Sequence, residues 1–168
     1  MPGIGAIVVL AVAVLILLTG GDDGGGGDDA PEGRSAEATV TRAVDGDTVE
    51  VSLDGTTEAV RYIGIDTPES VAPDQPVECF GERASHFNAG LVEGREVKLV
   101  FDAERRDQYG RLLAYVYLGN EFVNAELVRR GFARTLTIPP NTEHAELFER
   151  LARAAGTAGR GLWGACGP

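Results

Sequence analysis

Short stretches of alternating apolar and polar residues constrain the fold of this chain more than any other feature. Val49, Val51 and Leu53 alternate with polar residues and lead into Asp54-Gly55, which predicts a strand followed by a hairpin turn. Four more strands are predicted at residues 38–44, 57–65, around Val97, Leu99 and Phe101, and at residues 112–118. The chain is therefore expected to contain five short strands.

Three apolar stripes at helical spacing accompany these strands. They are formed by Ala84, Phe87 and Leu91, by Val123, Leu127 and Val128, and by Leu147, Phe148, Leu151 and Ala155. Gly94 follows the first stripe, Gly131 stands where a C-cap glycine would, and Thr142 is a candidate N-cap for the third. This pattern predicts an α+β fold, with a small β-barrel and three appended helices. An oligonucleotide-binding (OB) barrel is one candidate.

The first 37 residues differ in composition from the rest. Residues 4–18 form an unbroken apolar run, about 22 Å long as a helix at ~1.5 Å per residue. We interpret residues 1–19 as an apolar helix that serves as a signal peptide or an N-terminal membrane anchor. Residues 20–37 are rich in Gly and Asp and predict a flexible, disordered linker. The folded domain is then expected at 38–168.

The net charge limits how the protein can meet a polyanion. The chain has 26 acidic and 15 basic residues, a formal charge of −11, and residues 38–168 carry 20 acidic and 14 basic residues. Proteins that bind nucleic acid without specificity usually present a basic face. Contact with nucleic acid is therefore expected to be local.

Two cysteines, Cys79 and Cys166, agree with export. An exported protein can keep a disulfide, and this one would join the start of a helix to the C-terminus. The alternative is two free thiols in a reducing compartment. With the apolar leader present, we expect the disulfide.

Three carboxylates are predicted to meet at the ends of neighbouring strands. Asp47 lies in the bend 45–48, and Asp66 and Glu69 follow the next hairpin strand. Carboxylates brought together are costly unless a cation joins them, and hard oxygen ligands suit Ca²⁺ or Mg²⁺ better than zinc.

Two arginines extend this group toward phosphate chemistry. Arg61 lies on the strand that leads to Asp66, and Arg111 follows Asp107-Gln108-Tyr109-Gly110. Each guanidinium matches a phosphate in a bidentate manner. Each residue alone has a simpler interpretation as a turn or surface residue, but together they indicate phosphodiester hydrolysis with a divalent cation and a carboxylate base.

The order of these motifs resembles that of the staphylococcal nuclease (thermonuclease) family. The matching stretches are AVDGDTV at 43–49, RYIGIDTPE at 61–69, FGERAS at 80–85, DQYGRLLAY at 107–115, VNAELVRRG at 123–131 and GLW at 161–163. The resemblance implies a five-stranded OB-fold barrel with three helices. It also implies Ca²⁺-dependent cleavage of DNA and RNA at the 5′ P–O bond, which leaves 3′-phosphates.

The resemblance also implies roles for single residues. Asp47 and Asp66 would ligate Ca²⁺ with the carbonyl of Thr67, and Asp45 would support these ligands. Glu69 would be the general base. The phosphate would be held by Arg61 and Arg111, with Tyr109 near the nucleotide phosphate.

Three stretches depart from the family pattern. Residues 135–138 (TLTI) stand where the type enzyme has tyrosines that stack on the base, and Gln108 replaces a lysine. The loop 70–78 is acidic where the type enzyme has a basic loop. The type enzyme also lacks the cysteine pair. These changes predict weaker electrostatic capture or an altered base preference.

The sequence thus predicts a monomeric, Ca²⁺-dependent nuclease that acts on DNA and RNA, either outside the cell or anchored to the membrane and facing outward. Two alternatives stay open. One is a catalytically silent OB-fold module that binds nucleic acid or protein, and the other is a cell-surface interaction domain with structural calcium. A silent module is expected to lose an acidic ligand or an arginine, and here all of them remain. A structural calcium site gives no reason for both arginines to accompany the carboxylates.

Overall fold

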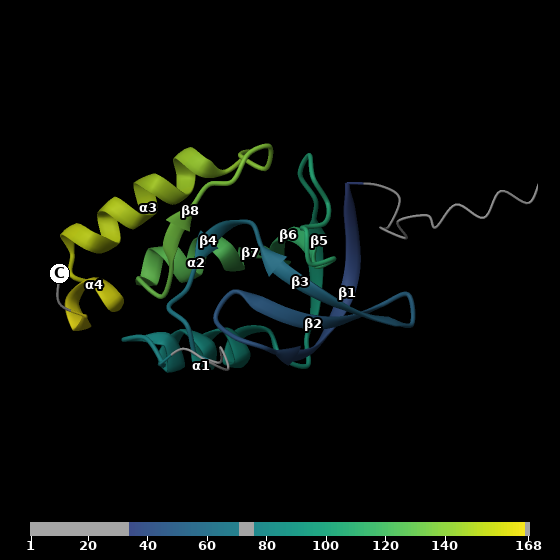
Figure 1. Cartoon of the computed structure of the whole chain (residues 1–168), viewed down its shortest axis with the longest axis horizontal. Helices are drawn as coiled ribbons and strands as arrows, with labels where there is room; N and C mark the ends of the chain where they lie inside the picture. The colour runs from purple at the N-terminus through teal and green to yellow at the C-terminus, as the bar shows by residue number, and fades with distance from the viewer. Residues whose placement is uncertain (1–33, 71–75, 167–168) are drawn as a thin grey trace, which may run out of the picture.

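A closed five-stranded barrel forms the body of the protein in the computed structural model, which describes residues 34–70 and 76–166 (Figure 1). The strands follow the order β3-β2-β1-β5-β6, and a parallel pairing of β3 with β6 closes the barrel. Their bounds are β1 Ser35–Ala43, β2 Thr48–Leu53, β3 Thr56–Tyr62, β5 Glu96–Val100 and β6 Leu112–Leu118. The expected five-stranded α+β barrel with three helices is confirmed.

Several strand bounds differ from those expected. β1 begins at Ser35, three residues before the expected start of the folded domain, because residues 35–39 pair with β5. The single strand expected at 57–65 ends at Tyr62, and a separate strand β4 (Gly64–Asp66) pairs with β8 (Arg134–Leu136). The short β7 (Glu121–Phe122) extends the main sheet beyond β6. Isolated short strands such as β8 lack an alternating pattern long enough to be recognised in the sequence.

Helix α1 spans Gly81–Val92, α2 spans Val123–Arg130 and α3 spans Ala145–Thr157. Gly131 is the C-cap of α2 with φ 77°, as expected from its position. The expected Thr142 cap is wrong: His144 is the N-cap of α3 and makes no side-chain capping hydrogen bond. A further short helix, α4 (Leu162–Ala165), was not expected.

The core explains why these elements pack together. Barrel side chains such as Val49, Leu99 and Leu112 are completely buried. Asn124 of α2 accepts a hydrogen bond from the Val116 backbone at 2.9 Å and donates one to the Ile63 carbonyl at 2.9 Å. A buried amide that satisfies two backbone groups fixes α2 against the end of β3 and against β6.

The expected disulfide is present in the structure. Cys79, just before α1, bonds to Cys166, just after α4, across 87 residues of sequence. The leader expected at 1–19 and most of the linker expected at 20–37 lie outside the described residues. Within the described part of the chain, no helix is long and apolar enough to cross a membrane.

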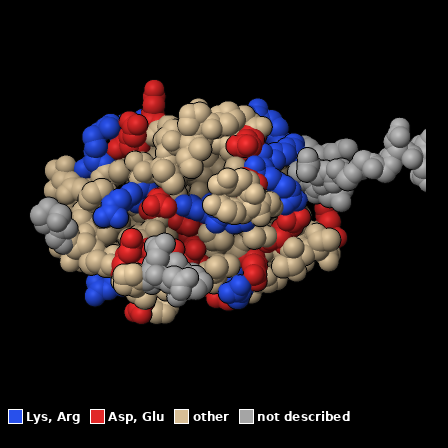
Figure 2. Space-filling view, in the orientation of Figure 1, with Lys and Arg blue, Asp and Glu red and all other residues tan. Residues whose placement is uncertain are grey.

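The surface carries both signs of charge. Figure 2 shows acidic and basic side chains interspersed over one face, with basic side chains on both sides of the acidic ones at its centre. This distribution agrees with the expectation that contact with a polyanion is local rather than spread over a broad basic face.

Candidate active site

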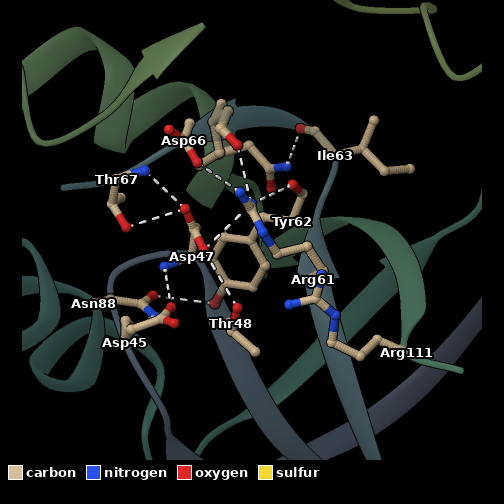
Figure 3. Close-up of polar contacts among 12 residues, drawn as sticks. Asp45, Asp47, Thr48, Arg61, Tyr62, Ile63, Asp66, Thr67, Asn88 and Arg111 are labelled. Carbon is tan, nitrogen blue, oxygen red and sulfur yellow. Dashed lines mark hydrogen bonds and ion pairs between the residues drawn. The ribbon is translucent and has the colours of Figure 1, made fainter. Parts of the chain in front are cut away.

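Residues 45–48, 61–69 and Arg111 meet at a small cavity beside the start of β2 and the end of β3. Its volume is about 120 Å³, and it is lined by Asp45, Asp47, Thr48, Arg61, Asp66, Thr67, Pro68, Glu69 and Arg111. The pairing of Thr48 with Arg61 places the 45–48 bend beside the end of β3. The structure therefore brings together the carboxylates and both arginines predicted from the sequence (Figure 3).

Asp47 lies at the centre of the hydrogen bonds drawn in Figure 3. Its side chain is only 6% exposed, and Oδ2 accepts hydrogen bonds from the Thr67 amide at 2.7 Å and from the Thr67 hydroxyl at 3.0 Å. The Asp47 amide donates to Asp45 Oδ1 at 2.9 Å. Burial raises the pKa of Asp47 to about 6, in spite of the opposing effect of Arg61.

Arg61 bridges the two carboxylates expected to bind metal. Its Nη1 lies 3.2 Å from Asp47 Oδ1, and its Nη2 donates to Asp66 Oδ1 at 2.9 Å. Nη1 also lies within hydrogen-bond distance of the carbonyl oxygens of Tyr62 and Ile65. The side chain is 15% exposed, so the strand end holds the guanidinium in one place between Asp47 and Asp66.

Arg111 reaches the same cavity from the neighbouring strand. Because Arg61 of β3 pairs with Leu113 of β6, Arg111 lies just before β6 and close to Arg61. Asp107 accepts hydrogen bonds from Arg111 Nε at 2.8 Å and from its amide at 3.0 Å. The Arg111 guanidinium lies on the side of Arg61 (Figure 3).

Glu69 enters the cavity from the segment after β4. It is half-buried, and its Oε1 accepts a hydrogen bond from the Ser70 amide at 2.8 Å. Its backbone is paired with Glu78: the Glu78 amide donates to the Glu69 carbonyl at 2.9 Å, and the Glu69 amide donates to Glu78 Oε2 at 3.2 Å. The backbone of Glu69 is therefore held by Glu78, and Glu78 is followed directly by the disulfide-bonded Cys79.

Tyr109 lines a different, larger cavity. This cavity has a volume of about 400 Å³ and shares Arg61 and Arg111 with the smaller one. Tyr109 is 75% exposed, and the guanidinium carbon of Arg111 lies 5.5 Å from its ring centroid. Leu136 and Ile138 line the same cavity and are exposed. Both belong to residues 135–138, which depart from the family pattern.

Two carboxylates of the cavity are of the donor type that a hard divalent cation prefers. Oxygens of Asp47 and Asp66 point at a common cationic group, here Arg61, and Thr67 lines the same cavity. The pKa of Asp47 is raised because burial outweighs the opposing effect of Arg61. The expected meeting of three carboxylates at one cation is not seen: Arg61 lies between Asp47 and Asp66, and no group of three or more His, Cys, Asp or Glu side chains among the described residues could hold a metal ion.

Two supporting residues were not identified from the sequence. Asp107 orients Arg111, and Asn88 donates to the Asp45 carbonyl at 2.9 Å and accepts from the Tyr62 hydroxyl at 3.0 Å. Asn88 is completely buried on α1. Its polar side chain beside an apolar stripe was the available signal, because a buried amide needs partners.

Comparison with known proteins decides the family. A family model described as "Staphylococcal nuclease homologue" matches residues 59–165. The chain is 41% identical to a thermonuclease of Staphylococcus intermedius over 130 residues, which cover 77% of each chain. It is 40% identical to a thermonuclease of Staphylococcus hyicus over 74% of this chain and 73% of that one. The chain belongs to the staphylococcal nuclease family.

A second kind of relative agrees with this assignment. The SPbeta prophage-derived endonuclease YokF of Bacillus subtilis is 41% identical over 129 residues, or 76% of this chain and 44% of the relative. This member of the staphylococcal nuclease family is therefore a nuclease, a phosphodiesterase that acts on nucleic acid.

Proposed function

We propose that this nuclease hydrolyses DNA and RNA in a Ca²⁺-dependent reaction that cleaves the 5′ P–O bond and leaves 3′-phosphates. The observation that carries the proposal is the single small cavity shared by Asp47, Asp66, Glu69 and the two arginines. Carboxylates alone would suit a structural cation site. The two guanidinium groups beside them give the cavity a place for a phosphodiester.

The proposed cation site consists of the Asp47 and Asp66 carboxylates and the Thr67 carbonyl. When bound, Ca²⁺ would polarise the phosphoryl group and offset its developing negative charge. Thr67 holds Asp47 through two hydrogen bonds, so one ligand is already oriented by the fold.

The chain's own groups carry the rest of the chemistry. Glu69 takes a proton from a water molecule, whose oxygen bonds to phosphorus as the bond to the 5′-oxygen breaks. The departing 5′-oxygen takes a proton from solvent. Arg61 and Arg111 donate hydrogen bonds to the phosphate oxygens, where negative charge increases in the transition state.

The test follows cleavage of single-stranded DNA by the full chain with its disulfide intact, in calcium, in magnesium and in EDTA. We expect turnover in calcium only. Glu69→Gln and Arg111→Ala should each lower kcat roughly 10²–10⁴-fold while circular dichroism stays unchanged. Arg153→Ala, on the exposed face of α3, is the matched control and should keep full turnover.

Other outcomes would identify the alternatives. Calcium binding by folded protein without cleavage would indicate an interaction domain with a structural cation. Binding of DNA without cleavage would indicate a silent module. Unchanged turnover in Glu69→Gln would remove this residue from the chemistry.

We further propose that the protein acts as a monomer outside the cytoplasm, either released or held at the membrane by residues 1–19. Disulfides form and persist in oxidising compartments, so the Cys79–Cys166 bond supports a location outside the cytoplasm. The apolar leader supplies a route out of the cytoplasm. Cell fractionation should find the full chain outside the cytoplasm. A variant without residues 1–19 should stay inside with alkylatable Cys79 and Cys166.

A further inference from the structure

The β4–β8 pair extends from the larger cavity to the carboxylates. Gly64 pairs with Leu136 at one end, and Asp66 pairs with Arg134 at the other. Residues two apart on a strand face the same side, so Leu136 and Arg134 share one face of β8, and both are exposed. This face therefore leads from the cavity of Tyr109, past Asp66, to Arg134.

Arg134 carries the exposed cationic group of this face. Among the described residues it makes no ion pair, although it lies across from Asp66, whose carboxylate is bonded to Arg61. By contrast, Arg129 and Arg130 on α2 are both paired with Glu126. An exposed guanidinium one strand away from the proposed metal ligands is placed to meet a second phosphate of the same nucleic-acid strand.

An aromatic ring lies against this guanidinium. The Arg134 guanidinium carbon lies 5.7 Å from the ring centroid of Trp163, which is 37% exposed. The ring is held in place because Leu162 beside it is buried, and the Leu162 amide donates to the Gly131 carbonyl at 2.8 Å. Rigid, partly exposed aromatic rings next to cations are the usual platform for single-stranded nucleic acid.

The Arg160 carbonyl accepts a hydrogen bond from the Trp163 amide at 3.1 Å, so a further cation belongs to the same turn. Arg160 is exposed in the turn before α4, and its guanidinium contacts only the Arg129 carbonyl, at 3.2 Å, among the described residues.

We propose that Arg134 and Trp163 form a second contact for the substrate strand, on the side of the catalytic cavity away from Tyr109. Arg134 binds a phosphate next to the cleaved one, and the exposed part of Trp163 contacts the adjoining base. The proposal rests on the proposed nuclease function, because the strand reaches this surface only if its scissile phosphate lies between Arg61 and Arg111. The contact would give the protein local affinity for the substrate strand, although the chain as a whole has a net negative charge.

Trp163 reports on this contact directly, because it is the only tryptophan of the chain. The full chain carrying Glu69→Gln is titrated in calcium with single-stranded DNA of two and of ten nucleotides, and binding is followed in parallel by anisotropy of labelled DNA. The ten-nucleotide strand should change Trp163 emission in step with anisotropy, and the dinucleotide should leave the emission unchanged.

Arg134→Ala in the same background should weaken binding of the ten-nucleotide strand roughly tenfold. It should also reduce the slope of log affinity against log salt by about 0.7, the contribution of one phosphate contact on a single strand. Arg153→Ala removes an exposed arginine on α3 and should change neither quantity. With active enzyme, Arg134→Ala should lower the ratio of kcat/KM for the ten-nucleotide strand to that for the dinucleotide.

Tight binding of the ten-nucleotide strand with unchanged emission and unchanged affinity in Arg134→Ala would overturn the contact. Absence of binding would overturn it as well. Failure of the proposed function is a separate result, seen as a wild-type chain that binds DNA and changes Trp163 emission but does not cleave.

Discussion

Burial of Asp47 has two opposite effects, one on its orientation and one on the stability of its charge. Its burial at the end of β2 lets Thr67 and Arg61 orient it, but the same burial makes its negative charge costly. Arg61 offsets part of this cost while it is bound to Asp66 as well. Under the proposed function, this orientation prepares Asp47 for a cation, and burial of its charge makes it costly when no cation is bound.

This penalty predicts a pH dependence of stability in EDTA. The folded carboxyl keeps its proton up to about pH 6, whereas an unfolded aspartate loses it near 3.8. The folded state therefore binds more protons in this window, and the contribution of Asp47 to stability falls as the pH rises through it. Relative to Asp47→Asn, the wild-type protein should lose about 2–3 kcal/mol of unfolding free energy between pH 4 and pH 7.

Urea unfolding at several pH values measures this difference. Parallel curves for wild type and Asp47→Asn would show that the Asp47 carboxyl titrates normally in the folded protein.

At the scale of single elements, α2 depends on a buried carboxylate. Glu126 accepts hydrogen bonds from Arg129 Nε at 2.9 Å and Nη2 at 2.7 Å, and it also pairs with Arg130. Burial alone would raise the pKa of Glu126, but the hydrogen bonds from both arginines outweigh it and the pKa is lowered. Its contribution is therefore present above the ordinary pKa of 4.5 and is lost as the pH falls through the lower folded value.

Glu126→Gln should then destabilise the protein by roughly 1–2 kcal/mol at pH 7 and by much less at pH 3. Glu149→Gln on α3 is the matched control, because Glu149 and its partner Arg153 are both more than half exposed. Its effect should stay within about 0.5 kcal/mol. Chemical denaturation at both pH values checks this, and an equal loss for Glu126→Gln at both would contradict an ionic origin.

The turn between β3 and β4 depends on a missing side chain. Gly64 has φ 81°, and a Cβ there would lie 2.5 Å from Phe148 Cε2 of α3. Gly64→Ala should therefore cost about 2–4 kcal/mol through backbone strain and overpacking. Gly90→Ala, with nothing within 4 Å of its Cβ on α1, should be neutral or stabilise by up to about 1 kcal/mol. Thermal unfolding compares the two variants, and equal midpoints would refute the steric argument.

At the scale of the whole molecule, the disulfide joins the two ends of the helical part. It closes a span of 87 residues, which corresponds to roughly 4–5 kcal/mol in the chain-entropy model. Cys79 also follows Glu78, whose backbone and side chain hold the backbone of Glu69. The bond thus supports both the stability of the fold and the segment that carries the proposed base.

Cys79→Ser with Cys166→Ser should lower the unfolding free energy by this amount and also reduce turnover at temperatures where the variant stays folded. Dithiothreitol should reproduce both effects in the wild type and have no effect on the double variant. Full turnover in the folded double variant would show that Glu69 is held by its local contacts alone.

Local patterns in the sequence were enough to predict the barrel strands, the three helices and the motif order that indicates a nuclease. These signals are local: alternation in β2, apolar spacing in α2 and the Gly131 cap are each contained within a few consecutive residues. Asp47, Asp66 and Glu69 were placed together from the sequence, because they lie near the ends of strands joined by a hairpin. The roles of Asp45 and Thr67 came from the family resemblance.

Features that depend on contacts between distant segments became visible only in the folded chain. The split of the third predicted strand at Ile63 follows from the pairing of β4 with β8, which lies about 70 residues further along the chain. The role of Asp107 beside Arg111, the hold of Glu78 on Glu69 and the placement of Arg134 between Asp66 and Trp163 have no local pattern. Short strands, ion pairs and stacked rings gain their energy from partners that only the closed barrel brings within reach.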